Sequence, residues 1–357
     1  MDPSSNIQHP TSIIQSPTSN SPLPVGKLPL PVLEELLGRY AIPDERLIVG
    51  PGAGEDAAVI DFGKSYLVAK TDPITFATDE IGWYAVHVNA NDVAVMGAQP
   101  RWFLATLLLP AGQADRAMAE TIVAQINSAC LSLGVALAGG HTEITHGLDR
   151  PIVVGTMLGE VQPERMVTTG GARVGDAIVL VKPVPIEGTA IIARERAGEL
   201  EAKGYDPALI ARAQNFLHDP GISVVRAALL AAEIAPVHAM HDPTEGGVVT
   251  GLLELARAAK AGLWVDLDRI PVPPESVALC AEYGLDPLGT IASGALLLTL
   301  PAGEAEGLRT ALAAEGIPAV VIGQMVEAAE GLQALRCGRE IPLPSFAVDE
   351  IARLFRE

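Results

Sequence analysis

The sequence contains few cysteines, and their positions exclude two common stabilising devices. Its 357 residues include three cysteines, Cys130, Cys280 and Cys337, an odd number at wide spacing. This spacing matches neither a disulfide framework nor a zinc-binding pattern. A chain without structural disulfides is typical of a reducing compartment, so we expect a cytoplasmic protein.

Positive charge is also scarce. Lys and Arg total 24 against 43 Asp and Glu, which gives a formal net charge of −19. Because nucleic acids and anionic membranes are themselves negative, this balance argues against a general affinity for either. Hydrophobic residues make up 49% of the chain but are dispersed, and no run approaches the roughly 20 apolar residues that cross a bilayer. The sequence therefore predicts a globular protein with neither nucleic acid nor membrane as a partner.

Two familiar nucleotide-binding motifs are absent as well. The sequence contains no Gly-x-x-x-x-Gly-Lys-Ser/Thr, which excludes a P-loop, and no Gly-x-Gly-x-x-Gly after a first strand. Any nucleotide must therefore be held in another way.

Length and composition divide the chain into segments. Residues 1–24 are rich in Pro, Ser, Thr and Asn, so we expect a disordered tail, and they lack the pattern of a secretory signal. The remaining length fits two domains of about 150 residues. A glycine-rich stretch at residues 170–176 marks the boundary between them. We predict domains at residues 25–160 and 172–326, followed by an extension at 327–357.

Strands and helices alternate without the repeated short βα unit of a parallel barrel, which favours an α+β fold. The predicted strands are residues 57–60, 66–70, 103–109, 135–138, 152–158, 177–181, 263–267, 295–300 and 319–323. The predicted helices are residues 31–40, 79–96, 114–133, 188–196, 207–215, 223–234 and 246–261.

The predicted helix over residues 79–96 carries polar side chains where apolar ones are expected. Asp92 falls on the apolar face of this helix, and Asn89 lies one turn before it. An unpaired carboxylate on such a face would be costly. Either Asp92 and Asn89 form a satisfied buried pair, or Asp92 binds a ligand.

Two acidic loops precede this helix. Asp56 lies where a loop enters a strand, and Asp72 lies at a strand end before Pro73. Each aspartate alone is also typical of a turn that it caps with its own side chain. If the loops converge with Asp92, they supply the oxygen ligands that Mg²⁺ prefers to share with phosphates. We therefore predict a metal and nucleotide site formed by Asp56, Asp72 and Asp92.

A pair of glycines follows the predicted strand 135–138. Gly139 and Gly140 would let the backbone approach a ligand closely, although an ordinary tight turn has the same pattern. His141 and Glu143 lie beside them and are candidates for general acid–base catalysis. A histidine in a loop without a ligand is the alternative interpretation.

The second half offers an anion site at a helix start. Gly246 and Gly247 open the predicted helix, and accessible amides at a helix start bind anions. The alternative is a plain helix capped by Asp242 or Thr244. In the first half, Lys27 is either a phosphate contact or solvated surface.

Taken in order, these motifs resemble those of the aminoimidazole ribonucleotide (AIR) synthetase superfamily. The motifs are residues 54–59 (GEDAAV), 71–73 (TDP), 91–98 (NDVAVMGA), 139–142 (GGHT) and 242–248 (DPTEGGV). The resemblance spans residues 25–326. Within the superfamily the sequence is most similar to the hydrogenase maturation (HypE-like) branch, and residues 284–288 (GLDPL) support this assignment. Selenophosphate synthetase and thiamine monophosphate kinase are relatives in the same superfamily.

The resemblance implies a two-domain PurM-like fold. An N-terminal sheet domain would form a homodimer, and a C-terminal α/β sandwich domain would close a cleft that holds ATP and Mg²⁺. The metal and phosphate ligands would be Asp56, Asp72 and Asp92, supported by Asn91. The glycines that approach the nucleotide would be Gly139, Gly140, Gly246 and Gly247.

The resemblance also implies an activity. In these enzymes ATP phosphorylates an oxygen, often of an amide, and so creates a leaving group for cyclisation or dehydration. We therefore predict an ATP-dependent enzyme acting on a small amide-like or carboxylate substrate. The alternatives are a small-molecule kinase like thiamine monophosphate kinase, or a nucleotide-binding assembly factor without turnover that serves a maturation partner protein.

Three features depart from the hydrogenase maturation branch. That branch ends in a Pro-Arg-Ile-Cys tail, whereas this sequence ends with residues 354–357 (LFRE), so nitrile synthesis on its own tail is not expected. His141 stands where the branch has an aspartate, which removes one potential metal carboxylate. Glu245 stands where the branch has an arginine, a potential phosphate partner.

Overall fold

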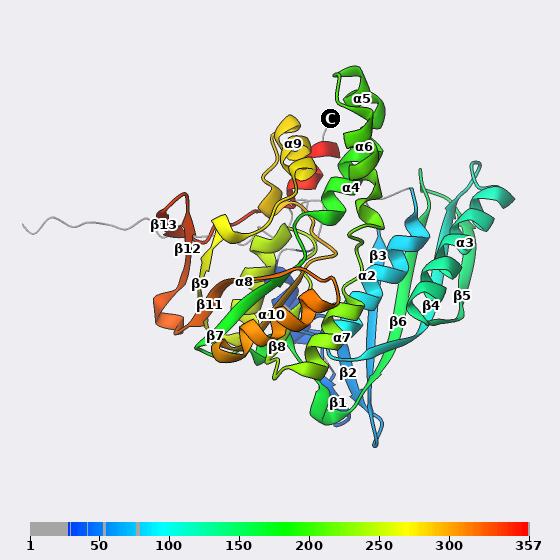
Figure 1. The fold of residues 1–357 in the computed structure, drawn as a ribbon. Helices are drawn as coiled ribbons and strands as arrows, with labels where there is room; N and C mark the ends of the chain where they lie inside the picture. Colours follow the sequence, from blue (N-terminus) through cyan, green and yellow to red (C-terminus); the bar gives the residue numbers. More distant parts are fainter. Residues whose placement is uncertain (1–27, 29, 41, 53–54, 76–78, 356–357) are drawn as a thin grey trace, which may run out of the picture.

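The structure, a computed structural model, describes residues 28–355 except residues 29, 41, 53–54 and 76–78. Two β-sheets with associated helices lie side by side, one from each half of the chain (Figure 1). This arrangement confirms the predicted two-domain α+β fold. The predicted disordered tail at residues 1–24, and Lys27, lie outside the described residues.

The first sheet is mixed and has six strands in the spatial order β1-β2-β3-β6-β4-β5. Its strands are β1 (Leu47–Val49), β2 (Ala58–Asp61), β3 (Tyr66–Ile74), β4 (Gln99–Pro110), β5 (Ala136–Thr145) and β6 (Ile152–Val161). β4 and β5 run parallel, whereas the other neighbouring pairs are antiparallel. β5 therefore forms one edge of this sheet.

The helices of the first half are α1 (Leu30–Tyr40), α2 (Ile81–Val95) and α3 (Arg116–Leu133). α2 and α3 lie together against one face of the first sheet (Figure 1). Along β4, buried residues alternate with more exposed ones, because the helices cover one face of the strand.

The second sheet is also mixed and has the order β13-β12-β9-β11-β7-β10-β8. Its strands are β7 (Asp176–Val181), β8 (Ala239–His241), β9 (Gly262–Asp266), β10 (Leu296–Pro301), β11 (Ala319–Val326), β12 (Leu332–Arg336) and β13 (Arg339–Pro342). β7 is buried at every position, which explains its continuous run of apolar residues. β8 is the short edge strand that leads into residue 242.

Seven α-helices accompany the second sheet among the described residues. They are α4 (Ile186–Glu195), α5 (Ala197–Ala202), α6 (Pro207–Gln214), α7 (Val225–Ile234), α8 (Gly247–Ala259), α9 (Pro274–Glu282) and α10 (Ala305–Ala314). Short 3₁₀ helices connect several elements, and one of them, η8 (Glu350–Phe355), ends the described chain. None of the helices in the described part of the chain is long and apolar enough to span a membrane.

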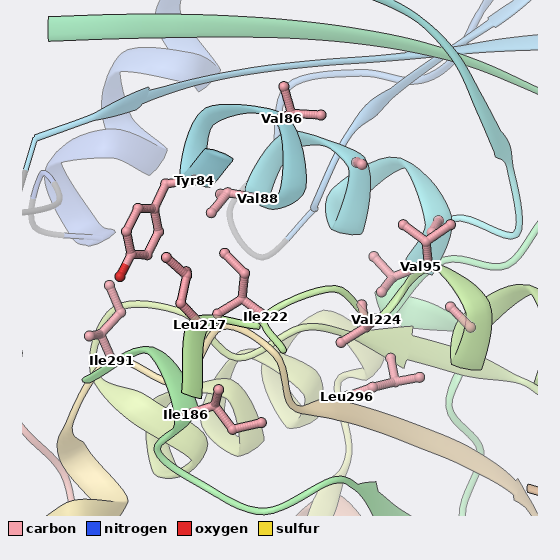
Figure 2. Close-up of a cluster of buried hydrophobic side chains, with 14 of the residues drawn as sticks. Tyr84, Val86, Val88, Val95, Ile186, Leu217, Ile222, Val224, Ile291 and Leu296 are labelled. Atoms are coloured by element: carbon pink, nitrogen blue, oxygen red, sulfur yellow. The ribbon is translucent and has the colours of Figure 1, made fainter. Parts of the chain in front are cut away.

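α2 is the element that joins the two halves. Nearly every residue of α2 is buried, because the first sheet lies on one side and the second half on the other. Figure 2 shows Tyr84 and Val88 of α2 facing Leu217 and Ile222 of the second half. A helix that is apolar all round is typical of such a central position. Any polar side chain on α2 is therefore enclosed by both halves.

Most predicted elements are present, with two kinds of difference. The strand predicted at residues 135–138 continues to Thr145, so the glycine pair lies within a strand. Elements not predicted from the sequence are α5, α9, α10 and the strands β1, β8, β12 and β13.

Candidate functional site

Three buried aspartates from both halves converge on one point. Asp56 precedes β2, Asp92 lies on α2, and Asp242 follows β8. One carboxylate oxygen of each lies within 4.8 Å of the other two. Within the described part of the chain, this is the only group of three or more side chains placed to hold a metal ion. The predicted convergence of acidic segments is therefore present for Asp56 and Asp92.

Asp242 is the member of this cluster that the sequence analysis did not select. Its side chain is 1% exposed, and neither carboxylate oxygen has a hydrogen-bond partner among the described residues. Burial, with the charges of Asp92 and Asp56, raises its pKa well above the usual range. A buried carboxylate without a hydrogen bond is costly, and a bound cation would compensate it. The three carboxylates are the ligand type that Mg²⁺ prefers.

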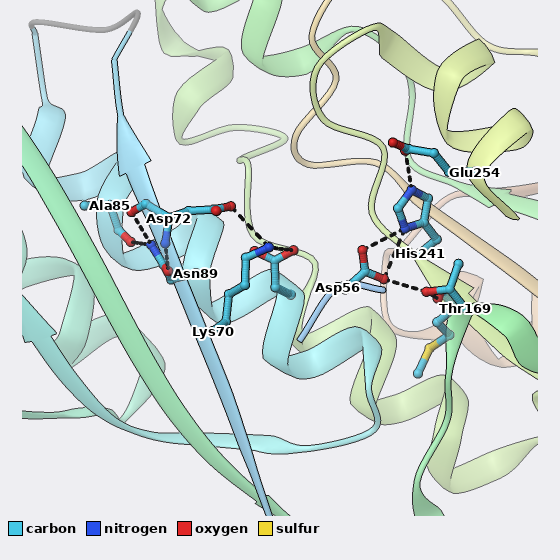
Figure 3. A network of polar contacts seen from close by, with 10 residues as sticks. Asp56, Lys70, Asp72, Ala85, Asn89, Thr169, His241 and Glu254 are labelled. Carbon is cyan, nitrogen blue, oxygen red and sulfur yellow. Dashed lines mark hydrogen bonds and ion pairs between the residues drawn. The ribbon is translucent and has the colours of Figure 1, made fainter. Parts of the chain in front are cut away.

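Asp56 is held by residues of the second half. Figure 3 shows its carboxylate between Thr169 and His241. Thr169 donates a hydrogen bond to Oδ2 at 2.8 Å, and Nδ1 of His241 lies 2.8 Å from Oδ1. Nε2 of His241 lies 3.0 Å from Oε2 of Glu254. These three partners were not predicted from the sequence, because Thr169, His241 and Glu254 are each distant from Asp56 in the chain.

The surroundings of His241 favour its protonated form. Burial would lower its pKa, but Asp56 and Glu254 outweigh burial and raise the pKa well above its usual range. The imidazolium therefore donates from both ring nitrogens, to one carboxylate on each side. It fixes the orientation of Asp56 within the cluster.

Lys70 of β3 lies on the other side of Asp92. Its Nζ atom is 3.4 Å from Oδ2 of Asp72 and 3.4 Å from Oδ1 of Asp92. Burial would lower the pKa of Lys70, but Asp92 and Asp72 outweigh burial and raise it. The ammonium group therefore stays charged beside Asp92, and Figure 3 shows it reaching toward Asp72.

Asp72 is separated from the three-aspartate cluster by this lysine. Asp72 is predicted from the sequence as a third metal ligand, but the structure brings Asp242 into that place and pairs Asp72 with Lys70. β3 continues to Ile74, so Asp72 lies within a strand rather than at its end. Asp72 and Lys70 are two residues apart and so share one face of β3, where Lys70 lies between Asp72 and Asp92.

Asn89 and Asn91 of α2 both form hydrogen bonds with backbone groups. Asn89 accepts a hydrogen bond from the Asp72 amide at 2.8 Å and donates to the carbonyl of Ala85 at 2.8 Å. Asn91 donates to the Ile222 carbonyl and accepts from the Val224 amide, both at 2.8 Å. Asn91 thus holds the segment with Ile222 and Val224 against α2, and any support that it gives to the metal ligands is indirect.

Gly139, Gly140, His141 and Glu143 lie on β5, at the exposed edge of the first sheet. A Cβ atom on Gly140, where φ is +150°, would lie 1.9 Å from the carbonyl oxygen of Ala105, so close approach to β4 explains this glycine. The His141 side chain is 67% exposed and lies 3.6 Å from Glu143. The structure does not bring these four residues into the aspartate cluster.

Gly246 and Gly247 begin α8, as predicted, but the first amide is occupied. The amide of Gly246 donates to Oδ2 of Asp349 at 2.5 Å, and the amide of Ile351 donates to Oδ1 at 2.7 Å. Burial raises the pKa of Asp349 to about 6, while these backbone hydrogen bonds lower it. In this structure a side chain of the C-terminal segment occupies the Gly246 amide, and a nucleotide contact by Gly246 and Gly247 stays a prediction.

These features define a two-domain α+β protein with a buried acidic site between its halves. Two family models match the chain: the AIR synthase related protein, N-terminal domain, over residues 54–161, and the AIR synthase related protein, C-terminal domain, over residues 173–333. The chain belongs to the AIR synthase related (PurM-like) superfamily. The resemblance found in the sequence is confirmed.

Individual similar proteins indicate the branch of the superfamily. Carbamoyl dehydratase HypE of Azotobacter vinelandii is 32% identical over 304 residues, covering 83% of this chain and 84% of the relative. Selenide, water dikinase of Paraburkholderia xenovorans is 32% identical over 265 residues, covering 71% and 69%. A crystal structure of the hydrogenase maturation protein HypE in complex with ATP is similar with a TM-score of 0.67 and 25% identity, covering 88% and 91%. The chain is thus a HypE-like member of an ATP-using enzyme superfamily.

Proposed function

We propose that this protein is a Mg²⁺-dependent enzyme that uses ATP to phosphorylate an oxygen of a small amide-like or carboxylate substrate. The observation that carries the proposal is Asp242, whose buried carboxylate has no hydrogen-bond partner among the described residues and lies within 4.8 Å of Asp56 and Asp92. A buried group of this kind fits a divalent cation. The solved relative with bound ATP supports the nucleotide.

The residues of the site have distinct roles in this proposal. Asp56, Asp92 and Asp242 hold the metal ion, and His241 and Thr169 orient Asp56. A bound Mg²⁺ neutralises charge on the phosphates and orients them for transfer. Lys70 places a further positive charge beside Asp92. Positioning and charge compensation would supply most of the rate enhancement.

The similar proteins suggest which group accepts the phosphate. Several similar proteins are described as carbamoyl dehydratases, which favours an acceptor oxygen of an amide-like group. The second candidate is simple γ-phosphoryl transfer by a small-molecule kinase, favoured by the similarity to selenide, water dikinase. A stable phosphorylated product would identify the kinase, and a cyclised or dehydrated product the first candidate.

A third candidate is a nucleotide-binding assembly factor without turnover, acting with a maturation partner protein. The exposed position of His141 and the Glu245 substitution motivate it. This candidate predicts saturable ATP binding without ADP release for any substrate.

We also propose a homodimer formed through β5. This edge strand is exposed along nearly its whole length, and a hollow of about 240 Å³ beside it is lined in part by Leu107, Val123 and Leu137. An exposed apolar strand edge is a typical pairing surface. In such a dimer His141 and Glu143 would face the partner copy, and their catalytic role stays a prediction. Light scattering on the purified protein would give the oligomeric state.

The experiment that tests the function is calorimetric titration of the non-hydrolysable ATP analogue AMPPCP with and without Mg²⁺. We expect Mg²⁺-dependent binding by the wild type and loss of at least tenfold in affinity for Asp242→Asn. Asp149→Asn, a matched change at an exposed aspartate, should bind as the wild type does. Equal binding by all three proteins would contradict the proposed site.

A further inference from the structure

We infer that the ammonium group of Lys70 takes the place of a second divalent ion, so that this site works with one metal ion per chain. The inference rests on the proposed function and specifies the cations of that same site.

Lys70 lies where a second cation would bind between Asp72 and Asp92. Its Nζ atom lies 3.4 Å from Asp72 and 3.4 Å from Asp92. Asp92 is also one of the three aspartates of the cluster. A single carboxylate therefore faces Lys70 on one side and the space between Asp56 and Asp242 on the other.

This arrangement matches the layout of a two-cation phosphoryl-transfer site. Two metal ions in such sites lie about 3.5–4 Å apart and clamp the oxygens of the reacting phosphate. Here Asp92 would lie between the two positive charges, one of which, the Lys70 ammonium group, is part of the protein. An ammonium group contacts phosphate oxygens as a compact point charge, so it can supply the same electrostatic clamp.

Among the described residues no cation contacts Asp242 as Lys70 contacts Asp92, because His241 pairs with Asp56 and Glu254 instead. Asp242 is 1% exposed, and its oxygens have no hydrogen-bond partner among the described residues. In contrast, Asp72 and Asp92 already have Lys70 between them. In the described ranges no additional carboxylate, histidine or cysteine joins Asp72 to form another group of three potential ligands. The residues therefore provide one place for a divalent ion and one place filled by lysine.

The test counts bound ions directly. Mn²⁺, in place of Mg²⁺, is titrated into the protein with saturating AMPPCP, and free Mn²⁺ is measured by electron paramagnetic resonance. We expect one bound ion per chain for the wild type. Lys70→Gln should bind two, because Asp72 and Asp92 lose the ammonium group between them and gain an ion, whereas Lys70→Arg should bind one. Lys64→Gln, a change at an exposed lysine in the turn between β2 and β3, should also bind one.

Two bound ions in the wild type, or one bound ion in a folded Lys70→Gln variant, would overturn the inference while leaving the proposed function intact. No bound ion in the wild type would overturn both. If the Lys70→Gln variant fails to fold, the number of ions bound by the wild type still tests the inference.

Discussion

Nδ1 of His241 lies 2.8 Å from Oδ1 of Asp56, a contact between residues 185 positions apart that ties the two halves together beside the aspartate cluster. The same histidine reaches Glu254 at 3.0 Å through Nε2. Since all three side chains are largely buried, their charges compensate one another rather than being screened by water.

Replacing His241 should therefore be costly. His241→Ala leaves Asp56 and Glu254 as buried carboxylates without their shared cation, and we expect a loss of about 3 kcal/mol in the free energy of unfolding. Urea unfolding followed by circular dichroism measures this loss. His146→Ala, at an exposed histidine, should change the free energy by less than about 0.5 kcal/mol. Similar losses in both variants would contradict a buried charge network.

Replacing Asp242 should have the opposite effect on the metal-free protein. Asp242→Asn replaces a buried carboxyl group whose ionisation beside Asp56 and Asp92 is unfavourable, and its new amide can donate to either of them. We expect the metal-free variant to be more stable than the wild type by about 1–2 kcal/mol. Thermal unfolding without metal measures the difference. A variant less stable than the wild type would show that Asp242 has a partner that the account omits.

Glu187 of α4 predicts a pH dependence of stability. Burial raises its pKa from 4.5 to about 7, and Asp349 and Glu245 add to the shift. The folded protein therefore binds the proton more tightly than the unfolded chain does. This contribution to stability is complete below pH 4.5 and is lost as the pH rises through 7.

Glu187→Gln should remove this loss. Relative to the wild type, the variant should gain about 2 kcal/mol of unfolding free energy between pH 5 and pH 8, since each pKa unit corresponds to about 1.4 kcal/mol. Urea unfolding at both pH values measures it. Glu164→Gln, at an exposed glutamate, should show no such gain. A difference between Glu187→Gln and the wild type that does not change with pH would be evidence against the shifted carboxyl group.

Much of the fold could be predicted from the sequence because its signals are local. The apolar periodicity of α2 and α3 and the apolar run of β7 indicate their type and approximate extent. β8 and β13 could not be predicted, since strands of three or four residues exist only through pairing with distant segments. The extension of β5 to Thr145 depends likewise on its pairing with β4.

The site was only partly predictable for the same reason. Asp92 was identifiable because it interrupts an apolar helix face, and Asp56 because it belongs to a recognisable motif. Asp242 has the local pattern of a helix cap, and only the pairing of β8 with β10 brings it to α2. The occupation of the Gly246 amide by Asp349, 103 residues away, is equally invisible in the sequence.

Gly155 of β6 offers a test of the packing beneath the site. A Cβ atom there would lie 2.4 Å from Nδ2 of Asn89 and 2.8 Å from the ring of Phe103. Gly155→Ala should destabilise the protein by about 1–3 kcal/mol because α2 cannot move away from the sheet without cost. Thermal unfolding measures the change. Gly198→Ala in α5 has nothing within 4 Å of the added carbon and should instead be neutral or slightly stabilising.

The most direct test of the central claim is a crystal structure of the protein with Mn²⁺ and AMPPCP. The account predicts an anomalous Mn²⁺ peak between Asp56, Asp92 and Asp242, with oxygens of all three and of the phosphates at about 2.0–2.5 Å. A fully bound nucleotide whose metal ion lies away from these three aspartates would contradict it.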